Sequence, residues 1–303
     1  MDRFEDMRCF VQVADLQSVT RAADSLNLAP SAVSRRLKDL EARLGAQLLS
    51  RTTRRMSLTE AGQVYFQSCQ RILGDIEEAE AHVSGKGQRM SGQLRVAAPL
   101  SFGLGHLTPA ICDFVESHPD LRVDLDASDR VVDLVGEGFD LALRIGILRD
   151  SSLIARKLCD VQMICCAAPE FLARRGVPAT PEDLRELPCL CYGGTERPDI
   201  WRWIDWDGAE QSVQVPMRMR STNGDINRDA AIRGLGVVLK PSFIVHRALA
   251  KGSLVRILPE VAWKGIQIHM VYPETRHLAA KTRAFIDHMR GHIGPEPYWE
   301  ADL

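Results

Sequence analysis

Hydrophobic residues recur at helical spacing three times within the first 45 residues of the chain. The pattern predicts a first helix over residues 4–15 and a short second helix that ends near residue 27, with Ser18 as its N-cap. A third helix begins at Pro30, a residue suited to the first helical turn. Two adjacent alanines in the second helix are small enough to allow a close crossing of helices. This arrangement is typical of a helix-turn-helix, although many helical hairpins share it.

The third helix has two chemically different sides when its residues are placed 100° apart. Four apolar side chains form one stripe, which predicts the core side: Val33, Leu37, Leu40 and Leu44. The opposite side carries two hydroxyls and two cations: Ser31, Ser34, Arg35 and Lys38. Hydroxyls at a helix N-terminus suit phosphate, and arginine and lysine suit guanine edges in a major groove. The alternative is a solvated helix face, and in the later turns we expect an ion pair between Asp39 and Arg43.

The stretch "LLSRTTRRMSLTEAG" predicts two short strands joined by a basic tip. The candidate DNA contacts at this tip are Arg51, Thr52, Arg54 and Arg55. Pro30, at the start of the third helix, is a further candidate contact. Beside a helix that reads the major groove, such a wing fits the DNA backbone at the flanking minor groove. The alternative is a solvated basic turn.

A long helix with an apolar stripe should follow the wing. Thr59 is its candidate N-cap, and the helix is expected to run to about residue 83. Its stripe recurs near a seven-residue spacing: Phe66, Cys69, Ile72, Leu73, Ile76, Ala79 and Val83. Such a stripe indicates pairing with a second copy of the chain, or packing on the chain's own body. Residues 84–92 are rich in glycine and serine and predict a hinge.

Residues 93–303 alternate strands and helices, which is typical of α/β folds with parallel sheets. We expect strands at residues 93–99, 121–127, 141–146, 161–169, 187–192, 213–219, 236–241 and 266–273. Expected helices span residues 104–116, 131–137, 225–233 and 277–292, with two more after Pro169 and Pro181. A segment of this length plausibly divides into two lobes. Ligands of such folds bind at the carboxyl ends of strands, where helix N-termini converge.

Charge is distributed unevenly along the chain. The net formal charge is -2, yet residues 1–58 hold ten basic and seven acidic side chains, a net of +3. The remaining residues therefore carry -5. A basic N-terminal part on an acidic body indicates nucleic-acid contact by the N-terminal part alone.

The N-terminal segment "SVTRAADSLNLAPSAVSRRLKDLEARLGAQLLSRTTRRMSLTEAG" resembles the winged helix-turn-helix of LysR-type transcriptional regulators. "GQLRVAAPLSFG", "DLALRIG" and "AAIRGLGVVLKPSF" resemble the family's effector domain. Two positions depart from the family pattern. Gln17 stands where glycine is usual, and Ala29 replaces a serine that often caps the third helix, which should cost about 1 kcal/mol of helix stability.

The resemblance implies a multidomain protein with a mainly α winged helix-turn-helix, a linker helix and a two-lobed α/β effector domain similar to periplasmic binding proteins. We place these parts at residues 1–58, 59–91 and 92–303. Lobe I would comprise about 92–162 and 265–303, and lobe II about 163–264.

Family positions also imply the effector-binding residues: Leu100, Ser101, Arg144, Thr222 and Asn223. Ser101 and the pair Thr222 and Asp225 have an alternative role as helix caps, whereas Arg144 is a cation inside an apolar strand and needs a partner. Our hypothesis is that the effector is a small anion, for example a carboxylate, because helix N-termini and Arg144 favour negative charge.

The implied partners are a palindromic promoter site in double-stranded DNA, a small-molecule effector, a second copy through the linker helix, a homotetramer and RNA polymerase. No catalytic residue, metal or cofactor is expected. The charged N-terminus and short apolar runs argue against a signal peptide or membrane span, which predicts a cytoplasmic protein.

Two alternatives to an effector-controlled regulator remain open. A redox sensor of the same architecture would use Cys189 and Cys191, among eight cysteines whose scatter otherwise suggests free buried thiols. A nucleotide-dependent enzyme would use Gly103 and Gly105 with Asp124 or Asp126 downstream, but the third glycine of a dinucleotide fingerprint is missing.

Overall fold

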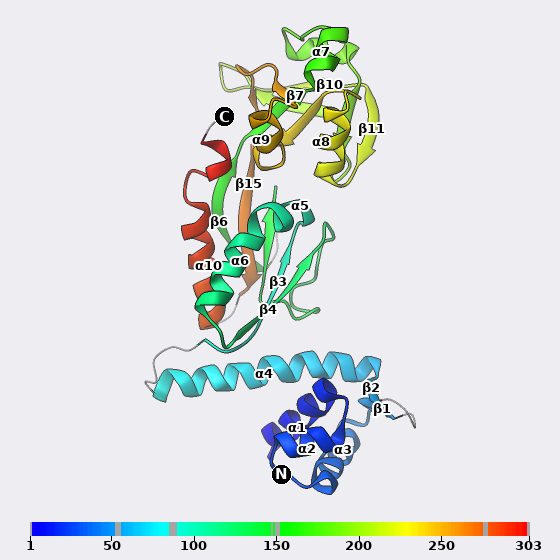
Figure 1. Cartoon of the computed structure of the whole chain (residues 1–303), viewed down its shortest axis with the longest axis vertical. Helices are drawn as coiled ribbons and strands as arrows, with labels where there is room; N and C mark the ends of the chain where they lie inside the picture. Colours follow the sequence, from blue (N-terminus) through cyan, green and yellow to red (C-terminus); the bar gives the residue numbers. More distant parts are fainter. Residues whose placement is uncertain are drawn as a thin grey trace. The chain divides into compact units, whose positions relative to one another are not determined.

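A computed structural model of the chain describes residues 2–51, 56–84, 90–146, 148, 152–274 and 278–301 (Figure 1). The side chains of Arg51, Asp75 and residues 77–84 lie outside this description. The chain divides into two compact units, Met1–Gln93 and Leu94–Leu303.

The first unit contains the three expected helices, the two-stranded wing and a long helix. Its elements are α1 (Arg3–Leu16), α2 (Val19–Ser25), α3 (Pro30–Leu44), β1 (Leu49–Arg51), β2 (Met56–Leu58) and α4 (Glu60–Ser84). The predicted N-cap of α2 is confirmed, because the Ser18 side chain accepts a hydrogen bond from the Arg21 amide. Gln17 adopts the left-handed conformation, with φ 49°, at a position where glycine would carry no Cβ penalty.

The core of the first unit forms where α1, α2 and α3 cross. Val33, Leu37 and Leu40 are buried as predicted, together with both alanines of α2. Leu44 is the exception: it is the last residue of α3, is 41% exposed, and lies past the packed stripe.

A buried carboxylate joins α1 to α3. Asp6 is 2% exposed and lies 3.5 Å from Arg36 Nη1 and 3.4 Å from Arg43 Nη2. The expected pair between Asp39 and Arg43 is therefore wrong. Arg43 extends toward the interior, where a less hydrated carboxylate attracts it more strongly, and Asp39 lies 3.9 Å from Arg35 instead.

The start of α4 is fixed to the chain before the wing. The Thr59 hydroxyl donates to the Gln47 carbonyl at 2.6 Å and accepts from the Gly62 amide at 2.9 Å, so its predicted capping role is confirmed. Cys69 of α4 is fully buried in the core of the first unit. The first half of the apolar stripe thus packs on its own domain, while the side chains of Ala79 and Val83 lie outside the described residues.

The second unit contains a five-stranded sheet in the order β4-β3-β5-β15-β6. Its strands are β3 (Gly92–Ala98), β4 (Leu121–Ala127), β5 (Leu141–Ile145), β6 (Leu153–Val161) and β15 (Ile266–Pro273). β3 and β5 are parallel, whereas β15 is antiparallel to both β5 and β6. The helices α6 (Thr108–Ser117) and α10 (Ala280–Ile293) lie beside this sheet (Figure 1). They supply Phe114 and Phe285 to the main core.

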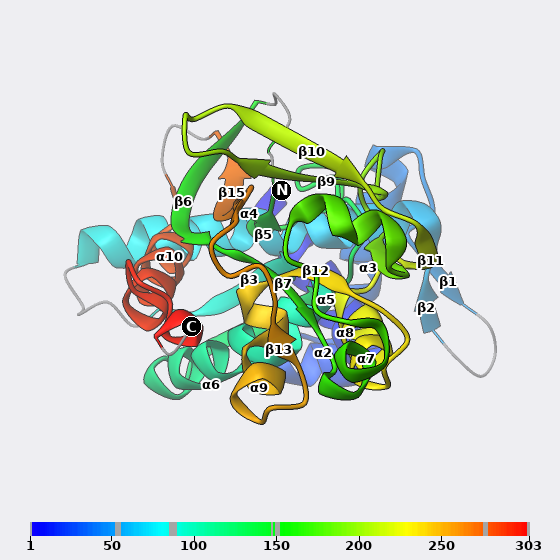
Figure 2. The same ribbon diagram turned by 90° about the horizontal axis from the view of Figure 1, so that it is seen from above.

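The remaining strands form three smaller sheets. They are β7 (Met163–Ala167), β8 (Cys189–Tyr192), β9 (Ile200–Ile204), β10 (Glu210–Gln214), β11 (Met217–Ser221), β12 (Val238–Pro241), β13 (Val255–Arg256) and β14 (Ala262–Trp263). β12 and β13 flank β7, β8 and β11 pair in parallel, and β9 and β10 form a long hairpin (Figure 2). Their helices are α7 (Pro169–Arg175), α8 (Gly224–Ile232) and α9 (Ser242–Ala250), with one 3-10 helix over Pro181–Glu186.

Several sequence-based elements of the second unit need correction. Residues 131–137 form turns instead of a helix, because the carboxylates of Asp133 and Glu137 accept local backbone amides and stabilise a turn. The helix expected over 104–116 begins earlier, as α5 (Leu100–Phe102) followed by a π-helical turn, Gly103–Leu107. The strand expected over 213–219 is divided between β10 and β11, with Pro216 between them. β6, β9 and α9 were not expected.

We predict that Gly62→Ala destabilises the first unit by about 1–3 kcal/mol, since a Cβ at this position would lie 1.9 Å from the Leu48 carbonyl oxygen. Amide hydrogen exchange in α1–α3 of the full-length protein measures the effect. Gly74→Ala is the matched control on α4: beyond its own helix backbone and chain neighbours, no described atom lies within 4 Å of the added Cβ, and alanine should stabilise the helix by about 0.5–1 kcal/mol. Equal exchange in the two variants would contradict the prediction.

Candidate functional site

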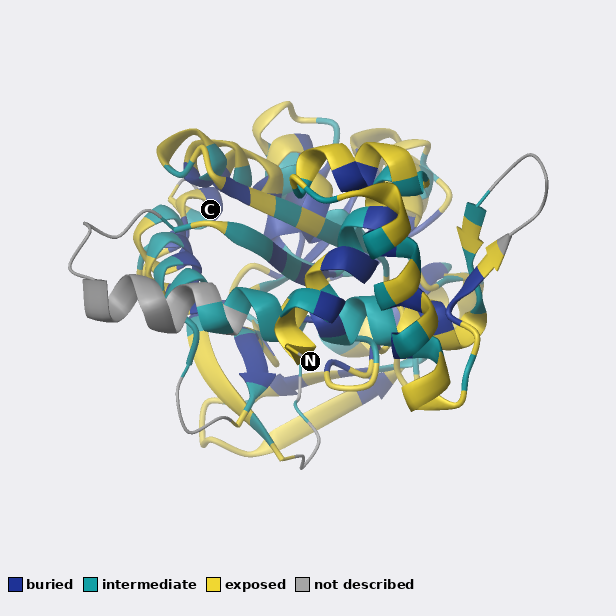
Figure 3. Ribbon diagram, turned by 90° about the horizontal axis from the view of Figure 1, so that it is seen from below, coloured by how far each residue is buried: buried dark blue, intermediate teal, exposed yellow. Residues whose placement is uncertain are grey.

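The exposed side of α3 carries the predicted DNA-binding side chains. Ser31 and Lys38 are exposed, Ser34 is half-buried, and the Arg35 side chain is 82% exposed. Figure 3 shows exposed positions in yellow along the helices near the N-terminus. Pro30 occupies the first helical turn, and Ala29 gives α3 no side-chain cap, as the sequence predicted. The ion pair between Arg35 and Asp39 is long and solvated, so it holds the guanidinium only weakly.

The wing begins from a fixed point on α3. The Glu41 carboxylate accepts the amides of Leu48 and Leu49 at 2.9 and 3.1 Å, which places β1 beside the helix. β1 and β2 then pair in antiparallel register, with Arg51 opposite Met56. Thr52, Arg54 and Arg55 lie outside the described residues, as does the Arg51 side chain.

Two of the predicted effector-binding residues lie at helix N-termini in the second unit. The Leu100 amide, at the start of α5, donates to the Asp129 carboxylate at 3.2 Å, and Ser101 follows half-buried in the same turn. The Asn223 side chain caps α8 by accepting the amides of Asp225 and Ile226. The capping role considered for Thr222 thus belongs to Asn223, and Thr222 is exposed.

The Arg144 side chain has a hydrogen-bond partner within the chain. Its guanidinium donates to the Val132 carbonyl at 3.0 Å, and burial lowers its pKa. In β5 it lies opposite His269 of β15. The described contacts therefore give Arg144 a role in holding the turns after β4.

A buried histidine holds the segment that carries Leu100 and Ser101. His106, in the π-helical turn, bonds the Phe243 carbonyl of α9 through Nε2 at 3.0 Å and the Tyr298 hydroxyl through Nδ1 at 2.6 Å. A carbonyl can only accept, so Nε2 carries the proton and Nδ1 accepts from Tyr298. Burial lowers the pKa of His106 to about 4, which keeps the ring neutral.

The sequence reasoning did not select Lys240 of β12. This lysine is 1% exposed, and its Nζ lies 5.1 Å from the centre of the Tyr192 ring. Nζ has no hydrogen-bond partner among the described residues, and burial lowers its pKa to about 8. Lys240 in "GVVLKP" shares with Arg144 the pattern of a cation in an apolar strand, and this pattern marks it from the sequence.

The two cysteines of the redox alternative are both buried. Burial raises the pKa of Cys191 to about 11 and that of Cys189 further, and the Cys189 thiol donates weakly to the Leu187 carbonyl. Reactive cysteines are accessible and have lowered pKa values, so these thiols do not fit the redox role in this state. Among the described residues, no group of histidine, cysteine and carboxylate side chains could hold a metal ion.

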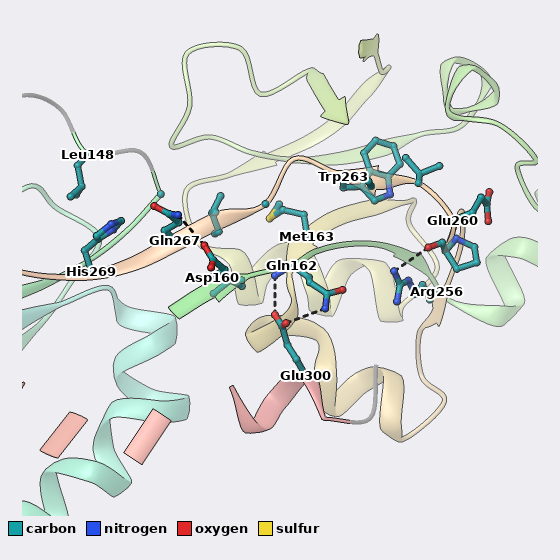
Figure 4. Close-up of a pocket in the computed structure, with 17 residues that line it drawn as sticks. Leu148, Asp160, Gln162, Met163, Arg256, Glu260, Trp263, Gln267, His269 and Glu300 are labelled. Carbon is teal, nitrogen blue, oxygen red and sulfur yellow. Dashed lines mark hydrogen bonds between the residues drawn. The ribbon is translucent and has the colours of Figure 1, made fainter. Parts of the chain in front are cut away.

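A crevice of about 790 Å³ lies where β6 and β15 leave the five-stranded sheet (Figure 4). Leu148 and His269 line one end, and Trp263 and Arg256 the other. None of the predicted effector-binding residues lines it.

The polar side chains between the two ends of this crevice are mostly paired with one another. Gln267 donates to Asp160 at 2.9 Å, and the Glu300 carboxylate accepts the amide and side chain of Gln162 (Figure 4). This part of the crevice is therefore stabilised by its own contacts.

Family comparison assigns both units. Residues 4–63 match the model of the "bacterial regulatory helix-turn-helix protein, lysR family", and residues 87–294 match the "LysR substrate binding domain". The chain belongs to the LysR family of transcriptional regulators. Its members are regulators rather than enzymes, so this chain is a DNA-binding transcriptional regulator with an effector-binding domain.

Individual relatives match this LysR-type regulator over nearly its whole length. The transcriptional regulator PtxR of Pseudomonas aeruginosa is 40% identical, over 95% of this chain and 92% of PtxR. The solved structure of CrgA, a LysR-type regulator from Neisseria meningitidis, is 34% identical, with a TM-score of 0.62 over 96% of this chain and 98% of CrgA. The virulence activator AphB of Vibrio cholerae is 28% identical, with a TM-score of 0.59 over 96% of this chain and 100% of AphB. None of the helices in the described part of the chain could cross a membrane.

We predict that His106 makes the folded protein less stable as the pH is lowered. The unfolded histidine binds a proton near pH 6.5 and the folded one only near pH 4, so the unfolded state binds more protons between these values. The free energy of unfolding should therefore decrease by on the order of 3 kcal/mol as the pH falls through this window. Urea denaturation of the wild type and His106→Gln, which does not titrate, measures the difference. Identical pH profiles for the two proteins would refute this assignment.

Proposed function

We propose that this LysR-type regulator reads a palindromic promoter site with α3 and clamps the flanking backbone with its wing. Residues 1–58 would be the DNA-binding domain, 59–91 the linker, and 92–303 the effector domain with lobes at about 92–162 plus 265–303 and 163–264. The base-reading side chains would be Arg35 and Lys38, with Pro30, Ser31 and Ser34 at the phosphates. Arg51, Thr52, Arg54 and Arg55 would contact the backbone from the wing.

One observation carries this proposal: α3 buries its apolar stripe and leaves a hydroxyl and two cations free of strong internal partners. Ser31, Arg35 and Lys38 are exposed on the side opposite Val33 and Leu37. Solvated cations, including Arg35 with its long, exposed pair to Asp39, can exchange their solvent for base edges or phosphates without losing a buried contact.

We further propose that the effector is a small anion bound near the helix N-termini of the second unit. The Leu100 amide already binds a carboxylate, that of Asp129, which supports an anion preference at this turn. Ser101, Thr222 and Asn223 would line the same site, and Arg144 would shape it through the Val132 carbonyl. This mode of control is favoured over thiol oxidation because Cys189 and Cys191 are buried and hold their protons.

Assembly would follow from the long helix α4. Its first half packs on its own domain, and we propose that the stripe beyond Cys69 pairs with a second copy and positions two α3 helices on a two-fold DNA site. A homotetramer and contact with RNA polymerase in the cytoplasm complete the proposed assembly.

We predict that Arg35→Ala weakens binding to the specific site by about 1–3 kcal/mol and relaxes its sequence preference. Mobility shifts of the full-length protein on a duplex selected from genomic fragments, with scrambled duplex as the reference, measure both effects. Arg175→Ala, an equivalent exchange on the exposed side of α7, should bind as the wild type does.

Arg54→Ala should mainly reduce the dependence of DNA affinity on salt concentration. Unchanged binding by both Arg35→Ala and Arg54→Ala would overturn the proposed DNA surface.

A further inference from the structure

Lys240 is a buried cation whose hydrogen-bonding needs the chain does not meet. An ammonium group has three donors and no acceptor, and a buried polar group without a partner is costly. Lys240 is 1% exposed, and among the described residues its Nζ has no hydrogen-bond acceptor. A buried lysine without a partner is therefore suited to bind a hydrogen-bond acceptor from outside the chain.

The groups packed around Lys240 supply no negative charge. The thiols of Cys166 on β7 and Cys191 on β8 are buried, and burial raises their pKa values to about 12 and 11, so both are neutral near pH 7. Asn227 of α8 donates its side-chain amide to the Cys191 carbonyl, and its Oδ1 likewise has no partner among the described residues. An amide oxygen carries no net charge, so Asn227 does not neutralise an ammonium.

Tyr192 connects Lys240 to the turn that carries Leu100. Its ring lies over Nζ, yet the residue itself is 39% exposed at the end of β8. Tyr192 also interacts electrostatically with Asp129, whose carboxylate occupies the Leu100 amide. The ring packs on Gly194, where an added Cβ would lie 2.5 Å from it. Lys240 is thus one aromatic ring away from the proposed effector site.

We propose that Lys240 is the anion receptor of this site and that the effector is a small monocarboxylate. The carboxylate pairs with the Lys240 ammonium after the Tyr192 ring turns aside. The Lys240 ammonium carries a single positive charge, which matches one negative charge and not a phosphate dianion. The inference rests on the proposed effector response of this regulator, and it assigns to Lys240 the anion-binding role expected of Arg144.

This role has a signature that a structural lysine would not show. A buried charge without a partner destabilises the ligand-free protein, so replacing it with an uncharged side chain of similar shape should preserve or raise stability. The same replacement should remove the stabilisation that a bound carboxylate provides.

The test compares full-length wild type with Lys240→Met and with Lys251→Met, the same exchange at an exposed lysine. Thermal unfolding is followed at pH 7 with increasing formate, acetate or benzoate at constant ionic strength, and with formamide, acetamide and benzamide as uncharged counterparts. Formate is small enough to reach any site that admits a larger carboxylate. Lys240→Leu provides a second uncharged variant.

We expect at least one carboxylate, and none of the amides, to raise the unfolding temperature of the wild type and of Lys251→Met in a saturable manner. Lys240→Met and Lys240→Leu should unfold at or above the wild-type temperature without ligand and should show no such rise. A wild type that responds to no carboxylate, a response that survives in Lys240→Met, or clear destabilisation of both Lys240 variants would each overturn the proposal.

Mobility shifts on the selected duplex separate this result from the proposed function. The wild type and the exposed control Lys251→Met should bind the duplex equally, because the first unit, which carries the proposed DNA surface, is a separate compact unit. A wild type that binds no specific DNA would refute the regulator's proposed reading of its site while leaving the thermal result on Lys240 intact.

Discussion

The burial of one side of α3 is the constraint on which the first unit depends. Val33, Leu37 and Leu40 enter the core between α1 and α2, and this fixes the rotation of the helix about its own axis. The opposite side must then face solvent, with its cations and hydroxyls in a row. Asp6 reinforces this arrangement by holding Arg36 and Arg43 on the inner flank, so that Arg35 and Lys38 remain outside. Glu41 of α3 holds the start of the wing, and Thr59 holds the start of α4 on the chain just before the wing. The packing of α3 therefore also determines where β1 begins.

The second unit depends on contacts between segments that are distant in sequence. His106 follows β3 in the chain, yet it bonds Phe243 of α9 and Tyr298 near the C-terminus. These bonds hold the turn with Leu100 and Ser101 against the part of the unit that contains Lys240. An effector that moved this turn would act on α9 as well, which gives the proposed ligand response a physical route. Because the histidine is neutral and buried, this connection is insensitive to small changes near neutral pH.

Local patterns predicted the first unit well because helical periodicity, caps and a proline all act over a few residues. Ser18, Thr59 and the stripe from Val33 to Leu40 behave as expected. The predictions are wrong where a contact depends on a residue that is distant in the sequence. Arg43 pairs with Asp6, 37 residues away, instead of with Asp39. Residues 131–137 have helical spacing, but local carboxylates capture their amides.

The proposed effector site shows the same limit. Asn223 and Leu100 lie at helix N-termini, as position in the sequence suggested. Arg144 was expected to bind or organise a ligand, and its guanidinium donates to the Val132 carbonyl, a contact that the sequence does not show. Lys240 also stands as a cation in an apolar strand, but its contact with the Tyr192 ring of another strand could not be inferred from the sequence. Residue type indicates which chemistry is available, and packing decides which cation is left without a partner.

The central claim is that the exposed side of α3 confers sequence-specific DNA binding. The most direct measurement is the selection of bound fragments from genomic DNA by the full-length wild type and by a variant with alanine at Ser31, Ser34, Arg35 and Lys38. The account predicts that the wild type enriches one shared, two-fold symmetric motif and that the folded variant enriches none. Enrichment of the same motif by both proteins would contradict it.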